Sequence, residues 1–269
     1  SDYSILATSE RYREVVAYWR QQLGGPETFV GALSTNVVRS TGPRRSIRVS
    51  TDPRTTAHLG ALANDDLGRF TVWSAGIVLA LSRYLNRSRV LILAPLLANE
   101  AGAPLNQERE LPLVFTAAPD ATLRQFVHGV AAVIENSDTY RDYPVRILAQ
   151  QDCGLDLAAD GEFSISSSAV HGDGLQTLAA VHFNLDGIAD GWMEVDYDPA
   201  RVEPFLVSGL ALFLEAALGH LGDLSTRIRE VTRLPDGQDQ LLRVGWNRTT
   251  TEPVEFQAAH SLFEAQVRL

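Results

Sequence analysis

Residues 89–97, Arg-Val-Leu-Ile-Leu-Ala-Pro-Leu-Leu, contain a continuous apolar run bounded by polar residues. A run of this length without alternating polar positions is typical of a β-strand covered on both faces. Pro95 is expected to end the hydrogen-bonded part of the strand, because proline has no backbone N–H to donate. Residues 70–85, just before it, are apolar on most sides and predict a buried helix.

Two later segments predict a β-hairpin. In residues 179–186, Val181, Phe183 and Leu185 alternate with polar residues, and residues 191–198 alternate in the same way. The link between them, Gly-Ile-Ala-Asp at 187–190, supplies the turn. Because each strand has one polar face, we expect the two strands to be antiparallel or to lie near a sheet edge.

The remaining periodicities predict the other elements. The expected strands are 46–51, 110–117 and 162–170, and the expected helices are 9–23, 53–63, 120–136 and 199–221. Asp52, which precedes a proline, is expected to cap the second of these helices. The order of elements indicates the α/β fold class, with a mixed sheet flanked by helices in an α/β sandwich.

The charged residues exclude several functions. The 269 residues carry 33 acidic and 23 basic side chains, a net charge of −10, which argues against binding to a nucleic-acid backbone. Every basic residue is arginine, so the chain has no lysine to serve as phosphate ligand, Schiff-base former or general base. No stretch of about 20 apolar residues is present, so we expect no membrane span.

The cysteine and methionine content bears on location and extent. Cys153 is the only cysteine, which excludes an internal disulfide and a paired-cysteine metal site. Because the first residues lack a signal-peptide pattern, we expect a cytoplasmic protein. The leading serine and the single methionine, Met193, predict that the chain is a fragment of a longer protein.

The nucleophilic and titratable residues give no specific catalytic signature. His171-Gly172-Asp173-Gly174 has two interpretations, an acid–base pair or a turn between strands, and its glycines favour the turn. Ser164, Ser166, Ser167 and Ser168 lack the G-x-S-x-G context of a hydrolase nucleophile. No H-E-x-x-H motif and no glycine-rich phosphate loop occurs, so we expect no metal and no cofactor of the chain's own.

Seven short segments stand in an order that one enzyme family shares. They are Ser1–Ser4, Ala17–Leu23 (AYWRQQL), Glu110–Leu113 (ELPL), Tyr140–Pro144 (YRDYP), Asp186–Asp198, Trp246–Thr249 (WNRT) and His260–Val267 (HSLFEAQV). Together they resemble the C-terminal half of a nonribosomal peptide synthetase condensation domain, its linker and the start of an adenylation domain. The resemblance implies one lobe of the chloramphenicol acetyltransferase-like fold in residues 1–233, a linker in 234–255 and an adenylation-domain start in 256–269.

The same segments supply the candidate family-motif and interface residues. These are Tyr18, Trp19, Arg20, Leu111, Pro112, Arg141, Asp142, Tyr143, Pro144, Trp246, Asn247, His260 and Phe263. Two motif positions depart from the family, since Arg109-Glu110 replaces Asn-Thr and Tyr140 replaces the leading histidine of H-Q-D-Y-P. The family's R-D-x-S-R-N-P-L-F stretch is not recognisable, and residues 153–160 stand in its place.

The functional implication depends on a missing motif. The family's catalytic H-H-x-x-x-D-G sequence lies in its first lobe, and no such sequence occurs in these 269 residues. The resemblance therefore implies a truncated lobe that is not an enzyme on its own. It would serve as a platform for the adjoining adenylation domain, and as a docking surface for a tailoring enzyme or a carrier protein with its phosphopantetheine arm. Arg141 and Arg146 are expected near the acidic carrier.

Two alternatives stay open. The chain would be half of a split condensation enzyme if a separate lobe supplied the catalytic histidine, and amide bonds would then form only when both lobes are present. The second alternative is an unrelated α/β acyltransferase or binding module. A sheet order unlike that of the chloramphenicol acetyltransferase-like fold would indicate it.

Overall fold

The computed structural model describes residues 10–24, 33, 42–98, 110–141, 144–157, 161–172, 177 and 179–231. The chain divides into two compact units, Ser1–Arg233 and Leu234–Leu269, and all described residues lie in the first. The linker at 234–255 and the adenylation-domain start at 256–269 therefore lie outside the described residues, and both stay predictions.

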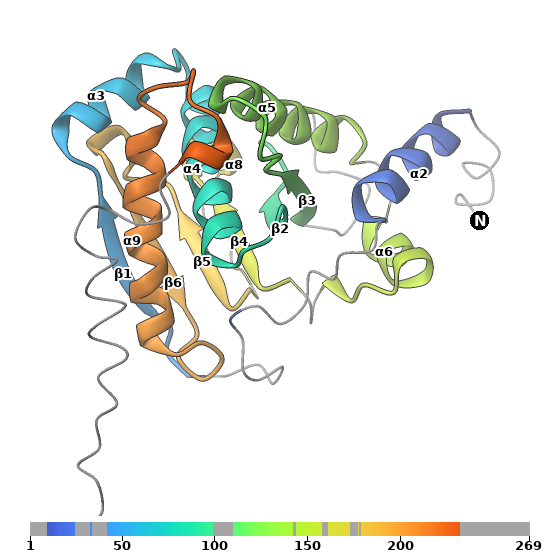
Figure 1. Ribbon diagram of the computed structural model, residues 1–269. Helices are drawn as coiled ribbons and strands as arrows, with labels where there is room; N and C mark the ends of the chain where they lie inside the picture. Colours follow the sequence, from blue (N-terminus) through green and yellow to red (C-terminus); the bar gives the residue numbers. More distant parts are fainter. Residues whose placement is uncertain are drawn as a thin grey trace, which may run out of the picture. The chain divides into compact units, whose positions relative to one another are not determined.

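A six-stranded mixed sheet forms one layer of the first unit, with the strand order β1-β6-β5-β4-β2-β3 (Figure 1). The strands are β1 (Arg45–Ser50), β2 (Arg89–Pro95), β3 (Glu110–Thr116), β4 (Phe163–Ser166), β5 (Val181–Asn184) and β6 (Trp192–Tyr197). Strand β4 runs parallel to both β2 and β5, whereas the pairs β2–β3, β5–β6 and β6–β1 are antiparallel. The mixed α/β fold class is confirmed.

Strand β2 has the burial that its sequence predicts. Every residue of the strand except Arg89 is buried, and the strand ends at Pro95. Strand β3 covers one of its edges and β4 the other. Because both edges are paired and both faces are covered, polar alternation along this strand would place uncompensated polar groups in the core.

The predicted hairpin is formed by β5 and β6. Val181 pairs with Tyr197, Phe183 with Val195 and Asn184 with Glu194. The connection is a short 3-10 turn, η1 (Ile188–Asp190), and Gly191 follows it with a positive φ of 78°. A left-handed residue at this point is favourable for glycine, which lacks the Cβ that makes this conformation costly.

Three long helices cover one face of the sheet. They are α4 (Asp66–Tyr84), α5 (Leu123–Thr139) and α9 (Pro204–His220), which lie side by side in front of the strands (Figure 1). The shorter helices are α2 (Glu10–Leu23), α3 (Pro53–Ala61), α6 (Val145–Cys153), α8 (Ser168–His171) and the 3-10 helix η2 (Ile228–Glu230). None of the described helices is long and apolar enough to span a membrane.

Helix starts follow the predicted capping chemistry. Asp52 accepts hydrogen bonds from the backbone N–H groups of Arg54 and Thr55 at the start of α3. Thr122 caps α5 in a reciprocal arrangement with Gln125. Side-chain oxygens thereby satisfy donors that the first helical turn leaves without intrahelical partners.

Two predicted elements were too long. The strand expected at 162–170 ends at Ser166, because the chain turns into α8, where His171 N–H donates to the Ser167 carbonyl at 2.9 Å. The helix expected at 199–221 begins only at Pro204. Proline disfavours a helical conformation at the residue before it, and Glu203 is extended, with φ −65° and ψ 134°.

Substituting Gly76 with valine is expected to lower the free energy of unfolding by about 1–3 kcal/mol. A Cβ at this buried position of α4 would stand 2.5 Å from Leu218 Cδ2 on α9, where the two helices pack together. Gly129→Ala is the matched control, because nothing lies within 4 Å of its added Cβ. That helical substitution should be neutral or stabilising by up to about 1 kcal/mol. Equal urea midpoints for the two variants would contradict the close helix packing.

Candidate functional site

Helix α2 is anchored at the C-terminal end of α5. Trp19 is fully buried, and its Nε1 donates a hydrogen bond to the Tyr140 carbonyl oxygen at 2.9 Å. The rings of Tyr18 and Tyr140 stack with their centroids 4.5 Å apart. The Tyr18 hydroxyl also lies 2.9 Å from Ser137 Oγ, and burial raises the pKa of this phenol. Two predicted motif segments far apart in sequence are thus in direct contact.

Tyr140, which replaces the histidine of the family motif, has a second contact through its ring. The guanidinium of Arg11 lies 4.8 Å from its ring centroid and donates to the Thr139 carbonyl oxygen. A cation over an aromatic face and a planar ring stack are both interactions that a tyrosine ring makes. The substitution is therefore compatible with a purely structural role at this junction.

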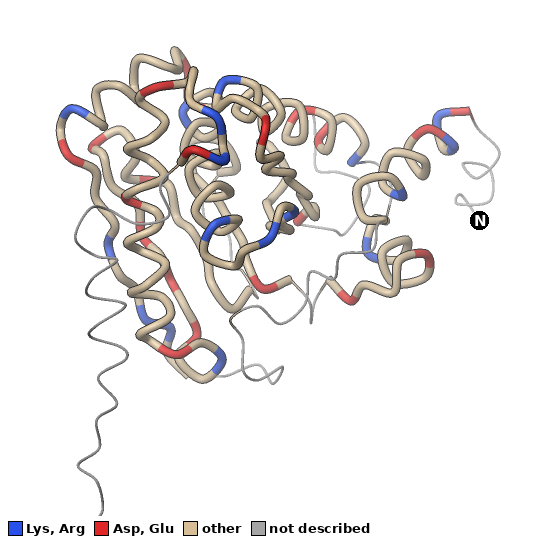
Figure 2. The backbone as a smooth tube through the Cα atoms, in the orientation of Figure 1, with Lys and Arg blue, Asp and Glu red and all other residues tan. Residues whose placement is uncertain are grey.

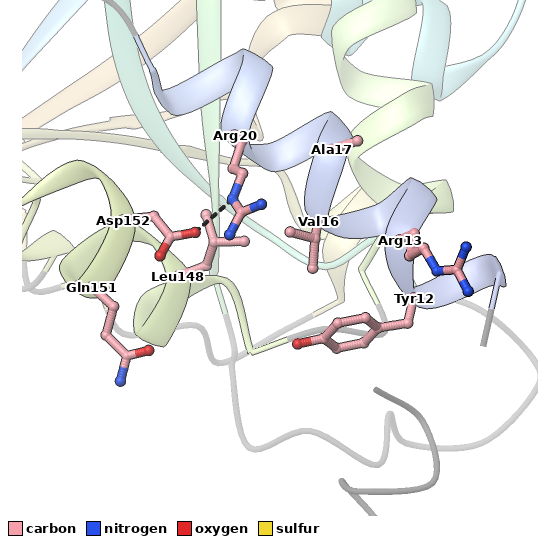
Figure 3. Close-up of a pocket in the computed structure, with 8 residues that line it drawn as sticks. All are labelled: Tyr12, Arg13, Val16, Ala17, Arg20, Leu148, Gln151 and Asp152. Carbon is pink, nitrogen blue, oxygen red and sulfur yellow. Dashed lines mark hydrogen bonds and ion pairs between the residues drawn. The ribbon is translucent and has the colours of Figure 1, made fainter. Parts of the chain in front are cut away.

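A groove separates α2 from α6 (Figure 3). Its volume is about 320 Å³. Helix α2 contributes Tyr12, Arg13, Val16, Ala17 and Arg20, and α6 contributes Leu148, Gln151 and Asp152. Arg20 Nε donates to Asp152 Oδ2 at 2.7 Å across the groove. Of the candidate residues, Arg20 lines this groove. Ala17 belongs to the same motif segment, and sequence reasoning missed the other six lining residues.

The cations expected near a carrier protein already face carboxylates of this chain. Arg141 lies 3.0 Å from Asp138, one turn earlier, and Arg146 lies 4.0 Å from Glu110. Burial raises the pKa of Glu110, while Arg146 and a hydrogen bond from Thr177 act in the opposite direction. Both arginines thus already have carboxylate partners within the chain.

The other candidates fall into two groups. Leu111 and Pro112 are buried in β3, and Pro144 stands at the start of α6. Asp142, Tyr143, Trp246, Asn247, His260 and Phe263 lie outside the residues whose side chains are described. The interface role of all of these residues stays a prediction.

A polar network crosses the sheet face opposite the three long helices. Ser164 Oγ lies 2.8 Å from His182 Nδ1, and Ser166 Oγ lies 3.1 Å from Nε2 of the same imidazole. Thr177 Oγ1 contacts Ser164 Oγ at 2.7 Å and extends the network to Glu110. Burial lowers the pKa of His182 to about 4, so the ring is neutral, with one nitrogen donating and the other accepting.

This network holds an imidazole between hydroxyls rather than preparing a nucleophile. A serine nucleophile needs a base whose second nitrogen is oriented by another group, usually a carboxylate. Here both nitrogens of His182 contact serine hydroxyls of the neighbouring strand. Alternation along β4 and β5 placed these residues on polar faces, but which strands pair could not be read from the sequence.

His171 and Cys153 have structural surroundings. The His171 ring packs edge-to-face on Phe70, with centroids 4.9 Å apart, and borders a mostly apolar cavity of about 10 Å³. Burial lowers the pKa of His171 to about 4. Asp173, its proposed acid–base partner, lies outside the described residues. Burial also raises the pKa of Cys153, at the end of α6, which disfavours the reactive thiolate.

Comparison with known proteins identifies solved structures of the same fold. No protein-family model matches the sequence, and none of the curated proteins matches it. The chain is similar to the X-domain from teicoplanin biosynthesis in its complex with OxyB, with a TM-score of 0.63, 16% identity, and coverage of 86% of this chain and 58% of that one.

Condensation domains give comparable matches. The starter condensation domain of rhizomide synthetase RzmA has a TM-score of 0.57 and 14% identity, with coverage of 87% of this chain and 57% of that one. The first condensation domain of the calcium-dependent antibiotic synthetase has a TM-score of 0.59 and 18% identity, with coverage of 86% of this chain and 55% of that one.

The chain spans somewhat more than half the length of the solved structures that it matches. At these identities the likeness establishes the fold and leaves the activity open. The six-stranded mixed sheet with its layer of helices is that of a condensation-domain-like, chloramphenicol acetyltransferase-like lobe.

Proposed function

We propose that the chain is a condensation-like lobe of a nonribosomal peptide synthetase that docks partner proteins and does not itself form amide bonds. The observation that carries this proposal is the fold likeness to an X-domain that forms a complex with another protein, OxyB. The lack of an H-H-x-x-x-D-G sequence in these residues supports it. So does the neutral His182, which two serine hydroxyls contact.

In this proposal the segments of the chain have different tasks. Residues 1–233 form the docking lobe, residues 234–255 connect it to an adenylation domain, and residues 256–269 begin that domain. The partner is a tailoring enzyme, or a carrier protein that brings its own phosphopantetheine arm. The chain itself holds no cofactor, and its setting is the cytoplasm.

Binding of the proposed partners provides the test. The 269-residue chain is titrated by calorimetry with the carrier protein and, separately, with the tailoring enzyme of the same synthetase. We expect micromolar binding of at least one of them, as is common for transient complexes. An unrelated protein of similar size and negative charge serves as the control. Binding of neither partner above that control would refute the proposal.

A second function, half of a split condensation enzyme, is favoured by one observation. The chain covers 55–58% of the condensation and X-domain structures that it matches, which leaves room for another lobe in a complete enzyme. Mixing the chain with a lobe that carries H-H-x-x-x-D-G would then restore amide-bond formation. A stable complex that yields product would favour this function over the docking lobe.

A further inference from the structure

The groove between α2 and α6 combines an apolar floor with charged rims. Val16 and Leu148 are buried beneath it, and Ala17 is an exposed lining residue on α2. A volume of about 320 Å³ is at the lower end of the range for ligand pockets and corresponds to a few side chains. The groove is therefore suited to receive a short apolar ridge from a second protein.

The two arginines of the groove differ in their partners. Arg20 and Asp152 lie together at one end, where they form the ion pair at 2.7 Å (Figure 3). Arg13 lies at the other end beside Tyr12. It stands seven residues, or two helical turns, before Arg20 and therefore on the same side of α2. Among the described residues no carboxylate is within ion-pair distance of Arg13.

The charge of the groove contrasts with that of the chain. Two arginines and one aspartate line it, whereas the complete sequence carries a net charge of −10. Figure 2 shows both basic and acidic positions along α2, and Arg11 already pairs with Glu14 at 3.7 Å. Arg13 is thus the cation of this surface that an incoming carboxylate can engage without breaking a described ion pair.

We propose that the α2–α6 groove docks an acidic amphipathic helix of a protein partner. The apolar ridge of that helix packs on Val16, Ala17 and Leu148, and one of its carboxylates pairs with Arg13. A helix laid in a groove between two others is a common recognition geometry, and complementary charge at the rim fixes its register and speeds association. This inference rests on the proposed docking function and specifies its contact surface.

Charge reversal at Arg13 tests the groove. The 269-residue chain is titrated with the acidic carrier protein of the same synthetase, and Arg13→Glu is expected to weaken binding by about tenfold or more. Arg124→Glu is the matched control. It reverses an exposed arginine on α5 that forms no described ion pair and lies outside the groove. Its affinity should remain within about twofold of the parent.

Photocrosslinking from the α2 side of the groove supplies an independent readout. p-Benzoylphenylalanine at Ala17 is expected to crosslink to the carrier protein, whereas the same residue at exposed Ala132 on α5 should not. Equal affinity of the parent and Arg13→Glu for the carrier protein, together with no crosslink from Ala17, would overturn the proposal that the groove is the docking surface. The proposed docking function would remain intact. Failure of the carrier protein to bind the parent would also overturn the groove proposal. The docking function fails only if the tailoring enzyme does not bind either.

Discussion

Replacing Trp19 with alanine is expected to lower the free energy of unfolding by about 3–5 kcal/mol. The indole is fully buried, donates to the Tyr140 carbonyl, and meets the Tyr18 ring edge-on at 5.0 Å. Its removal would leave a large cavity and an unpaired carbonyl where α2 joins α5. Urea unfolding at constant protein concentration gives the loss as a lower midpoint at similar slope.

Trp19→Phe separates the packing from the hydrogen bond. Phenylalanine keeps most of the aromatic body but has no N–H, so we expect a loss of about 1–2 kcal/mol. Limited proteolysis of Trp19→Ala should cut within α2 before any other described helix, because local anchoring is lost first. A change below about 1 kcal/mol in Trp19→Ala would show that α2 is not anchored through this residue.

Acidification is expected to destabilise the protein through one buried and one half-buried histidine. Burial lowers the pKa of His171 and of His182 to about 4, whereas an unfolded histidine titrates near 6.5. Below about pH 6.5 the unfolded chain therefore binds more protons than the folded chain does. The free energy of unfolding falls from that pH as the pH approaches about 4. The full contribution is on the order of 3 kcal/mol for each histidine.

The charges around His182 act in both directions on its pKa. Burial is the largest cause of the lowered pKa. Arg44 and His171 also lower the pKa, whereas Asp186 raises it. His182→Asn removes this titration and keeps a polar group near Ser164. We expect this variant to be less stable than the parent at about pH 7 and to lose less stability than the parent on acidification. His128→Gln, which removes an exposed imidazole on α5, is the control and should follow the parent curve. Parallel curves for His182→Asn and the parent would contradict a neutral imidazole at His182.

The sequence predicted the elements with strong hydrophobic periodicity. Strand β2, the β5–β6 hairpin and the cap at Asp52 depend on local patterns, and all were confirmed. The end of β4 was missed because Ser168 N–H donates to Asp186 Oδ1, a residue eighteen positions away. Contacts of this kind are set by tertiary structure, which local propensity does not encode.

The candidate site could be predicted only in part for the same reason. The resemblance selected Tyr18, Trp19 and Arg20 on α2, but the groups that they contact lie in α5, at its C-cap and in α6, more than a hundred residues later. Arg13 and Asp152 match no motif, and their common groove appears only once the two helices pack together. The serines of β4 and His182 likewise meet through strand pairing that alternation alone does not specify.

The central claim, a docking lobe without condensation activity, is tested most directly by one measurement. Donor and acceptor carrier proteins loaded with aminoacyl groups are incubated with the 269-residue chain, and intact-protein mass spectrometry follows the acceptor. We expect no dipeptidyl-loaded acceptor above the level without the chain. Accumulation of that product at a rate proportional to the concentration of the chain would contradict the claim.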